Sequence, residues 1–184
     1  MKNIRGLLAA LFAACAILSV GEASAGAIGL NQWEEFSFGL AGSALTGCSS
    51  STCTAGDISV FAPASPWTFS CATSCVLQVT DAFLSGDQFT FFDNLVSLGL
   101  TSAPTLQANC GNAVLTCVAN ASFSHGLFLL AAGAHSISGT VSVSPFLAGA
   151  AFFIVKAVNV PEPSTILLLA LGLLAVSVLS RRRA

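Results

Sequence analysis

Charged residues are scarce in this sequence. They make up 8% of the 184 residues, where a typical soluble domain has roughly 25%, and hydrophobic residues make up 54%. We therefore expect part of the chain to contact lipid. Between residues 26 and 160, six acidic residues accompany one basic residue, Lys156, which gives a net charge of −5. An acidic segment without a basic patch argues against nucleic-acid binding and against peripheral binding to anionic lipid.

Histidine is scarce too, and this absence limits the reactions to be considered. His125 and His135 are the only two histidines, and Ser124 before His125 does not form a nucleophile elbow. A catalytic triad assembled by the fold stays open, as does a glycosidase pair made from Glu34 or Glu35 and one aspartate. The sequence favours a protein that is not an enzyme, with an extracellular hydrolase as the weaker alternative.

The N-terminus has the three parts of a secretory signal. Lys2 and Arg5 provide positive charge, residues 7–20 form an apolar run, and Ala23 and Ala25 form a small-residue cleavage site. The apolar run is too short to span a membrane comfortably. We therefore expect a signal-peptide helix within residues 1–25, cleaved after Ala25.

Six of the seven cysteines follow the signal peptide, and they stand in three close pairs. An even number of cysteines in an exported chain indicates disulfides, and close spacing favours local pairing. In zinc sites, cysteine ligands are usually separated by two intervening residues or accompanied by histidines, and neither pattern occurs here. The predicted disulfides are Cys48 with Cys53, Cys71 with Cys75, and Cys110 with Cys117.

The C-terminal residues 160–184 also have three parts. Residues 160–165 are extended by two prolines, residues 164–180 form an apolar helix, and Arg181, Arg182 and Arg183 follow. A helix of this length spans about 25 Å, close to the roughly 30 Å of a hydrocarbon core. The arginines should stay on the cytoplasmic side as a membrane stop. The prolines and the preceding segment, residues 26–159, then lie outside.

This order of an extended Pro-Glu-Pro motif, an apolar helix and a terminal arginine cluster resembles the PEP-CTERM sorting signal of Gram-negative bacteria. The resemblance implies that Pro161, Glu162 and Pro163 are recognised by an exosortase, a membrane-embedded enzyme. It also implies a link to exopolysaccharide and biofilm production. We expect an inner-membrane-anchored precursor that reaches the cell envelope surface or the extracellular matrix as a structural or interaction protein.

Short alternating runs dominate residues 26–159 and predict an all-β fold. Polar and apolar residues alternate from 135 to 144, which places Ile137, Val141 and Val143 on one face of a strand. Similar runs occur at residues 35–40, 67–70, 76–80 and 88–92, with turn-forming residues between them. Residues 129–132 could form one helical turn, but no long amphipathic helix is expected. The spacing predicts an antiparallel β-sandwich or jelly roll.

Two binding hypotheses remain for this domain. Trp33 and Trp67 could be exposed aromatic platforms of a carbohydrate-binding module, although aromatic residues more often pack in a core. Asp81, Asp87 and Asp93 recur every six residues, and oxygen-rich turns can bind Ca²⁺. Aspartate also starts solvated turns without any metal. The sequence therefore requires no cofactor and leaves calcium as the candidate.

Overall fold

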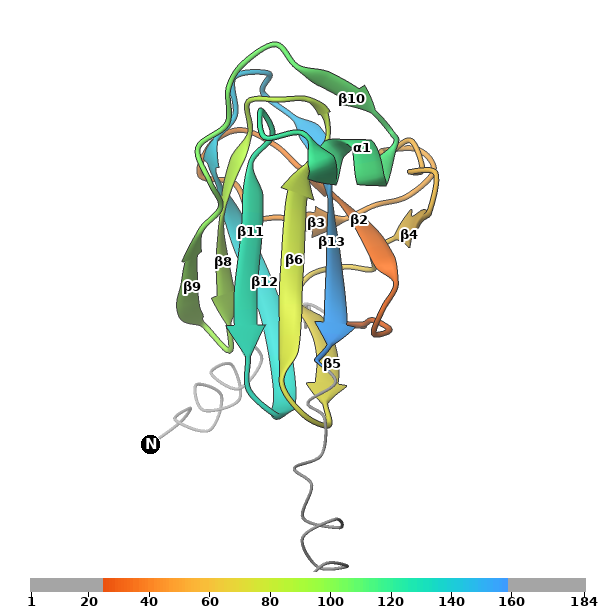
Figure 1. The fold of residues 1–184 in the computed structure, drawn as a ribbon, viewed down its shortest axis with the longest axis vertical. Coiled ribbons are helices and arrows are strands. Elements are labelled where there is room, and N and C mark those ends of the chain that lie inside the picture. The colour runs from red at the N-terminus through yellow and green to blue at the C-terminus, as the bar shows by residue number, and fades with distance from the viewer. Residues whose placement is uncertain (1–24, 159–184) are drawn as a thin grey trace, which may run out of the picture.

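Two β-sheets packed face to face make up most of residues 25–158, the part of the chain that this computed structural model describes (Figure 1). The five-stranded sheet has the order β1 (Gly26–Ala27), β5 (Trp67–Cys71), β12 (Gly133–Val143), β8 (Gln88–Asp93) and β9 (Val96–Leu100). The six-stranded sheet is made of β11 (His125–Leu130), β6 (Cys75–Asp81), β13 (Gly149–Ala157), β2 (Trp33–Phe38), β3 (Thr46–Gly47) and β4 (Ser59–Phe61), which pairs with β2. The remaining elements are the short pair β7 (Phe83–Leu84) and β10 (Asn109–Gly111) and the single helix α1 (Val114–Ala119).

The all-β prediction is confirmed, and each of the five alternating runs overlaps a strand. The sheets are not wholly antiparallel as predicted, because β1 pairs with β5 and β4 pairs with β2 in parallel. One residue departs from the predicted pattern. Ile137 and Val141 on β12 are buried, but Val143 is 44% exposed. The pairing of β12 with β8 shifts between Val141 and Val143, and this irregularity turns the end of the strand away from the core. Residues 129–132 form the end of β11 and a turn rather than a helical turn.

Strand β13 is central to the six-stranded sheet because both of its faces are apolar. It pairs antiparallel with β2 on one side and with β6 on the other. Phe153 and Val155 face the other sheet, while Phe152 and Ile154 face outward. A strand buried on both faces has no polar alternation, so the alternation pattern does not reveal it.

The space between the sheets holds the larger of two hydrophobic clusters, which we call the inner cluster. Phe36 is fully buried at its centre. Its ring lies 5.4 to 6.3 Å, centroid to centroid, from five other aromatic rings, those of Phe38, Trp67, Phe89, Phe91 and Phe153. Tilted and edge-on aromatic pairs at these distances stabilise a core beyond the area they bury. The phenylalanines are therefore the main packing material of the fold.

A second cluster lies on the outward face of the six-stranded sheet, and we call it the outer cluster. It brings Trp33, Phe152 and Ile154 of the sheet against Val114 of α1 and Phe123 after it. Helix α1 and the loops around it cover this face, as Figure 1 shows in green. The six-stranded sheet is thus buried on both sides at this end.

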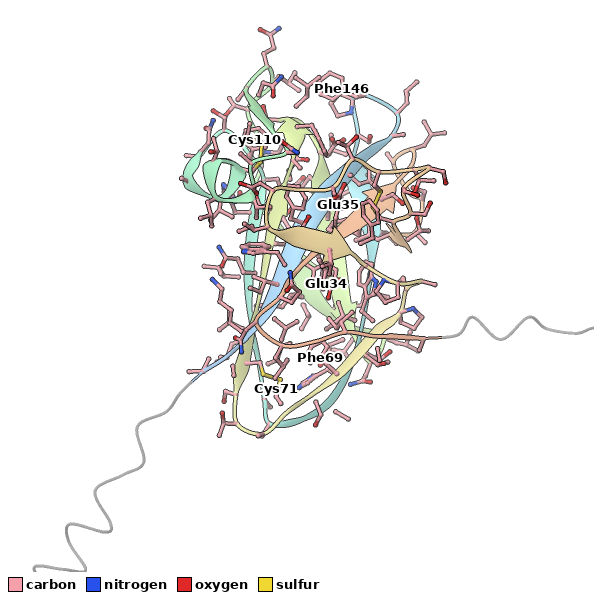
Figure 2. All side chains as sticks on the ribbon, turned by 90° about the vertical axis from the view of Figure 1, so that its right-hand side faces the viewer. Glu34, Glu35, Phe69, Cys71, Cys110 and Phe146 are labelled. Carbon is pink, nitrogen blue, oxygen red and sulfur yellow. A yellow bond between two sulfur atoms is a disulfide. The ribbon has the colours of Figure 1, made fainter. Side chains whose placement is uncertain are left out.

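The structure forms the three local disulfides that the cysteine spacing predicts, Cys48–Cys53, Cys71–Cys75 and Cys110–Cys117. Cys71 lies near one end of the sandwich and Cys110 near the other (Figure 2). The Cys71–Cys75 bond joins β5 to β6, which belong to different sheets, and the Cys110–Cys117 bond joins β10 to α1. The bonds are local in sequence, yet two of them connect separate elements.

Candidate functional site

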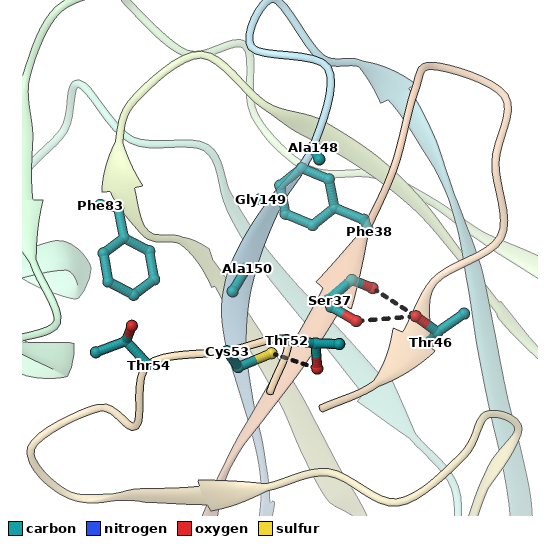
Figure 3. Close-up of a pocket in the computed structure, with 10 residues that line it drawn as sticks. All are labelled: Ser37, Phe38, Thr46, Thr52, Cys53, Thr54, Phe83, Ala148, Gly149 and Ala150. Atoms are coloured by element: carbon teal, nitrogen blue, oxygen red, sulfur yellow. Dashed lines mark hydrogen bonds between the residues drawn. The ribbon is translucent and has the colours of Figure 1, made fainter. Parts of the chain in front are cut away.

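Loops at one end of the sandwich surround a hollow of about 570 Å³ (Figure 3). One wall carries the hydroxyl groups of four residues, Ser37, Thr46, Thr52 and Thr54. Ser37 and Thr46 lie on the paired strands β2 and β3, and their Oγ atoms are 2.9 Å apart. The hollow therefore presents neutral hydrogen-bonding groups.

A smaller hollow of about 160 Å³ adjoins the first, and both are lined by Phe83 and residues 148–150. Asp87 lies in its wall and is only 3% exposed. Its Oδ1 atom is buried and makes no hydrogen bond of normal geometry, although the Ser144 hydroxyl, which also has no partner, is close enough to lower the pKa of Asp87. A buried carboxylate oxygen without a donor is costly, and a bound ligand would remove that cost.

Asp81 holds the loop that carries Asp87. Its Oδ1 accepts the backbone N–H of Ala82 at 2.8 Å, and its Oδ2 accepts those of Gly86 at 3.1 Å and Asp87 at 3.2 Å. Burial, followed by the charge of Asp87, raises the pKa of Asp81 to about 8. Burial raises the pKa of Asp87 to about 6, and the Ser144 hydroxyl opposes this shift. Two adjacent carboxyls thus favour their neutral forms.

The structure does not bring together the three aspartates proposed as calcium ligands. Asp81 and Asp87 are neighbours, but Asp93 lies at the far end of β8. Its Oδ2 is 2.7 Å from the Nδ1 of His135, and its Oδ1 accepts the N–H of Ser136. A single calcium site formed by all three residues does not match this arrangement. Asp87 alone offers a free carboxylate oxygen among the three.

The two histidines occupy structural positions in the described fold. His135 is 8% exposed, and its Nε2 lies 2.9 Å from the carbonyl of Ala131, so both of its ring nitrogens are engaged. The Nε2 of His125 lies 3.0 Å from the carbonyl of Asn120. Neither histidine lines the two hollows described above.

The prediction of exposed tryptophan platforms is wrong. Trp67 is fully buried in the inner cluster, and Trp33 is 7% exposed in the outer cluster. The Nε1 of Trp67 donates to the carbonyl of Pro63 at 2.9 Å, which satisfies its one polar group. A sugar-binding surface in this domain would have to use other side chains.

Glu34 and Glu35 are adjacent on β2 but face opposite sides of the sheet (Figure 2). Glu34 is paired with Phe153 of the inner cluster, and Glu35 is paired with Phe152 of the outer cluster. Both are buried, at 4% and 0% exposure. Burial raises the pKa of Glu34 to about 7 and also raises the pKa of Glu35.

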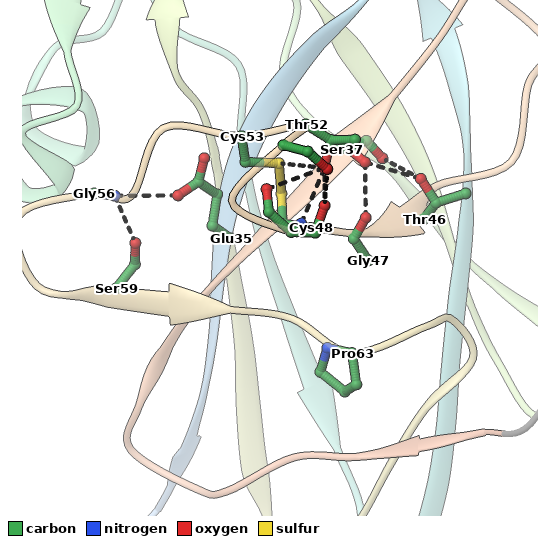
Figure 4. The surroundings of a disulfide bond; sticks show 12 residues. Glu35, Ser37, Thr46, Gly47, Cys48, Thr52, Cys53, Gly56, Ser59 and Pro63 are labelled. Carbon is green, nitrogen blue, oxygen red and sulfur yellow. Dashed lines mark hydrogen bonds between the residues drawn. A yellow bond between two sulfur atoms is a disulfide. The ribbon is translucent and has the colours of Figure 1, made fainter.

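Glu35 lies beside the Cys48–Cys53 disulfide (Figure 4). A carboxylate oxygen of Glu35 and the two sulfur atoms lie within 4.8 Å of one another. Such a trio is a potential metal-ligand set, but the sulfur atoms are bonded to each other and are not thiolates. As long as this disulfide is intact, we assign no metal to the group.

The residues predicted to direct sorting, Pro161, Glu162 and Pro163, lie outside the described residues. So do the membrane-stop arginines Arg181, Arg182 and Arg183. Among residues 25–158, no helix is long and apolar enough to cross a membrane. Ala25, the predicted cleavage position, is exposed and directly precedes β1.

A family model of the PEP-CTERM protein-sorting motif matches residues 159–183. The chain carries a PEP-CTERM sorting signal. This match confirms the resemblance seen in the Pro-Glu-Pro motif, the apolar stretch and the arginine cluster. The PEP-CTERM signal implies an exported protein, made as a membrane-anchored precursor of the cell envelope, with exosortase as its processing partner. No curated protein and no solved structure matches the chain.

Sequence reasoning missed the polar features of the described domain. The pair Glu34 and Glu35 in a strand of aromatic residues was a usable signal, because an alternating strand must send one glutamate to each face. The contact of Glu35 with a loop that begins more than ten residues later carries no local signal. The burial of the Asp87 carboxyl likewise depends on how two loops pack against each other, which the local sequence does not show.

Proposed function

We propose that this PEP-CTERM protein is a structural or interaction protein of the cell surface or extracellular matrix, linked to exopolysaccharide. The sorting signal at residues 159–183 is the observation that carries the proposal. In this scheme the signal peptide exports the chain and the C-terminal helix holds it in the membrane. Exosortase then cuts near Pro161, Glu162 and Pro163 and releases the β-sandwich for delivery.

The described domain has features that suit an exported structural role. All six cysteines of residues 25–158 are paired, which stabilises a small domain in an oxidising compartment. The two sheets enclose a continuous aromatic core. Paired cysteines and a closed core suit a domain that has to stay folded outside the cytoplasm.

The side chains of residues 25–158 give little support for an enzyme. The ring nitrogens of His135 are both engaged, and the two hollows contain no histidine. Glu34 and Glu35 are buried and line neither hollow, so neither is presented to a sugar together with an aspartate. We therefore propose a binding or scaffolding role and not a hydrolytic one.

Intact-mass measurement of the protein from an exporting host and from the same host without exosortase tests the processing step. We expect residues 164–184 to be missing only when exosortase is present. Glu162→Ala should block this loss, whereas Thr165→Ala, a change just after the motif, should leave it intact. A tail retained in both hosts would contradict processing and indicate a permanent anchor.

Carbohydrate binding is the second candidate, and one observation favours it. Asp87 lines a hollow that adjoins the larger hollow, which is lined by serine and threonine hydroxyls. The domain has a single basic residue, Lys156, which bonds Gln78 on β6 and does not line either hollow. A neutral sugar fits this surface better than an acidic one.

Retention on immobilised neutral polysaccharide tests the second candidate. We expect Asp87→Asn to weaken retention, because it removes the free carboxylate. Asp57→Asn is the matched control, since Asp57 is exposed and caps α1 through the N–H of Val114. Equal retention of both variants would remove the sugar-binding candidate without affecting the processing scheme.

A further inference from the structure

The Cys48–Cys53 disulfide differs from the other two in its exposure. The cysteines of Cys71–Cys75 are 2% and 1% exposed, and those of Cys110–Cys117 are 7% and 0% exposed. Cys48 and Cys53 are half-buried, and Cys53 lines the hollow of about 570 Å³. An external thiol can therefore approach the sulfur of Cys53 without unfolding of the domain.

The same disulfide has a buried carboxyl group beside it. Glu35 is fully buried, and its Oε2 accepts the backbone N–H of Gly56 at 3.1 Å. Its Oε1 is buried and has no hydrogen-bond partner. The carboxyl is therefore fixed through Oε2, and one of its oxygens lies within 4.8 Å of both sulfur atoms, a distance that one water molecule can bridge to relay a proton.

Gly56 is required for this arrangement. A Cβ atom on Gly56 would lie 2.8 Å from Cε1 of Phe152 and 2.5 Å from the hydroxyl of Ser59. Only glycine allows the backbone to approach the outer cluster closely enough to donate to Glu35. The loop from Cys48 to Ser59 therefore covers Glu35, and glutamate is rarely fully buried unless it is paired.

We propose that Cys48–Cys53 is a thiol–disulfide exchange site in which Glu35 donates a proton to the departing sulfur. The co-reactant is an external dithiol, and the site forms a mixed disulfide on the side of the hollow. The two inaccessible disulfides remain structural. This inference concerns the described domain and does not depend on the sorting scheme.

The exchange proceeds in two steps. A thiolate of the dithiol attacks the sulfur of Cys53, a new sulfur–sulfur bond forms, and the Cys48–Cys53 bond breaks. The electron pair stays on the sulfur of Cys48, which takes the proton of Glu35. The second thiol of the reductant then loses its proton to solvent and attacks the reductant sulfur that is bonded to Cys53. Cys53 departs as a thiolate and is protonated from solvent, so the dithiol is oxidised and the disulfide reduced.

Contacts around the site favour this course. The hydroxyl of Thr52 donates to the sulfur of Cys53 at 3.7 Å and stabilises the thiolate formed in the second step. Burial raises the pKa of Glu35, so the carboxyl keeps a proton above the usual pH range of a glutamate. Once the proton is lost, the negative charge of Glu35 opposes a thiolate beside it.

The titratable groups near Glu35 leave it without a counter-ion. Asp57, at the end of the same loop, is exposed and accepts the N–H of Val114. Glu34 faces the inner cluster, and Asp81 on β6 binds backbone N–H groups. Lys156 on β13 donates to Gln78. The groups that face the Glu35 carboxyl are neutral: Gly56 donates its N–H to it, and both this N–H and the Ser59 hydroxyl lower the pKa of Glu35 against the larger effect of burial.

Timed reduction of the full chain in detergent tests the proposal. Dithiothreitol is added, the reaction is quenched with an alkylating agent, and peptide mass mapping gives the opening rate of each disulfide. We expect Cys48–Cys53 to open first, at least about tenfold faster than the others, because its sulfur atoms are accessible and those of the other two disulfides are buried. Simultaneous or later opening of Cys48–Cys53 would overturn the proposal without any mutation.

The role of Glu35 is read from the pH profile. Division of the Cys48–Cys53 rate by the rate at which the same dithiothreitol reduces oxidised glutathione cancels the ionisation of the reductant and gives a rate ratio. This ratio should fall as pH rises through the raised pKa of Glu35. Glu35→Gln should lower the ratio about tenfold at acidic pH and remove its pH dependence, whereas Glu35→Asp should keep the dependence.

Glu34→Gln is the matched control, because Glu34 is the neighbouring buried glutamate and faces away from the disulfide. It should keep the wild-type ratio at every pH. A Glu35→Gln profile equal to that of Glu34→Gln would overturn the role of Glu35 as proton donor. If exosortase still removes the tail while the Glu35→Gln and Glu34→Gln profiles are equal, the sorting scheme stands and only the role of Glu35 fails. The two outcomes can therefore be told apart.

Discussion

The two faces of the six-stranded sheet differ in composition and in what covers them. The inner face packs against another sheet through aromatic rings, and Phe36 alone has five aromatic neighbours. The outer face is covered by one short helix and by loops. Phe152, its largest ring from β13, has one aromatic neighbour, Phe83, at 6.3 Å.

Buried carboxyl groups also separate the two faces. Glu35 lies on the outer face, and Asp81 and Asp87 lie where β6 and its following loop meet the outer cluster. Glu34 is the exception on the inner face. The comparison indicates that the inner face provides stability, while the loops over the outer face provide the polar groups available for chemistry.

Replacement of one phenylalanine on each face should show the largest difference. We expect Phe36→Ala to lower the free energy of unfolding by about 4 to 5 kcal/mol, and Phe152→Ala by about 3 kcal/mol, since both rings are fully buried but only Phe36 loses several aromatic pairs. Denaturant unfolding of both variants measures the difference. An equal or larger loss for Phe152→Ala would contradict the assignment of stability to the inner face.

The carboxyls near the outer cluster should make the protein less stable at higher pH. The folded pKa of Asp81, about 8, exceeds its ordinary value of 3.8, and Asp87 shifts the same way to about 6. A carboxyl with a raised folded pKa stabilises the fold below its unfolded pKa, and this contribution is lost as pH rises through the folded value. We expect the free energy of unfolding to fall between about pH 4 and 8 by on the order of 2 to 3 kcal/mol, less than the sum at roughly 1.4 kcal/mol per pKa unit, because Asp81 and Asp87 interact and their shifts do not add independently.

Asp81→Asn isolates this effect, since it removes the titrating group with little change in size. Denaturant unfolding at several pH values should give a flatter profile for the variant, with the remaining slope in the range where Asp87 and Glu34 titrate, since their pKa values are raised to about 6 and about 7. Asp57→Asn, at an exposed position, should keep the wild-type slope. A wild-type stability that rises with pH would show that both carboxyls are ionised in the fold.

The sequence revealed the features that depend on near neighbours. The alternation of residues 135–144 predicts β12 because a half-buried strand repeats every two residues. The three disulfides follow from cysteines that are at most seven residues apart. The sorting signal is linear, so its motif, apolar stretch and arginines are all readable in order.

Features that depend on distant contacts were not predictable. Strand β13 lacks alternation because both of its faces are buried, and Trp67 is fully enclosed because two sheets meet around it. The spacing of Asp81, Asp87 and Asp93 suggested one site, but a loop and a strand separate the third from the others. The contact between Glu35 and the Cys48–Cys53 loop arises only when the loop folds back over β2.

Loss of one disulfide from each cluster should separate local from global stability. We expect the pair Cys110→Ser and Cys117→Ser to cost about 2 kcal/mol, the loop-closure value for a short loop. Ala113 itself provides no side-chain cap, and the one side-chain acceptor at this end is Asp57, which takes the N–H of Val114, so α1 depends mainly on the disulfide and on packing. Hydrogen exchange should therefore quicken at α1 and β10 and change little in the inner cluster. In contrast, Cys71→Ser with Cys75→Ser should quicken exchange in β5 and β6, and a uniform change in both variants would contradict the distinction.

The smallest expected effect concerns the rim of the outer cluster. Lys156 is exposed, and its Nζ lies 5.8 Å from the centre of the Trp33 ring and 2.8 Å from the Oε1 of Gln78. An exposed cation over an aromatic ring contributes about 0.5 kcal/mol, so Lys156→Met should lower the free energy of unfolding by about that amount. Lys156→Arg keeps the cation and should match the wild type in the same denaturant measurement. A fall in the free energy of unfolding above about 2 kcal/mol for Lys156→Met would be as large as the effect of a core substitution. The stability of the outer face would then depend on this exposed contact, and the contrast between the two faces would be weaker.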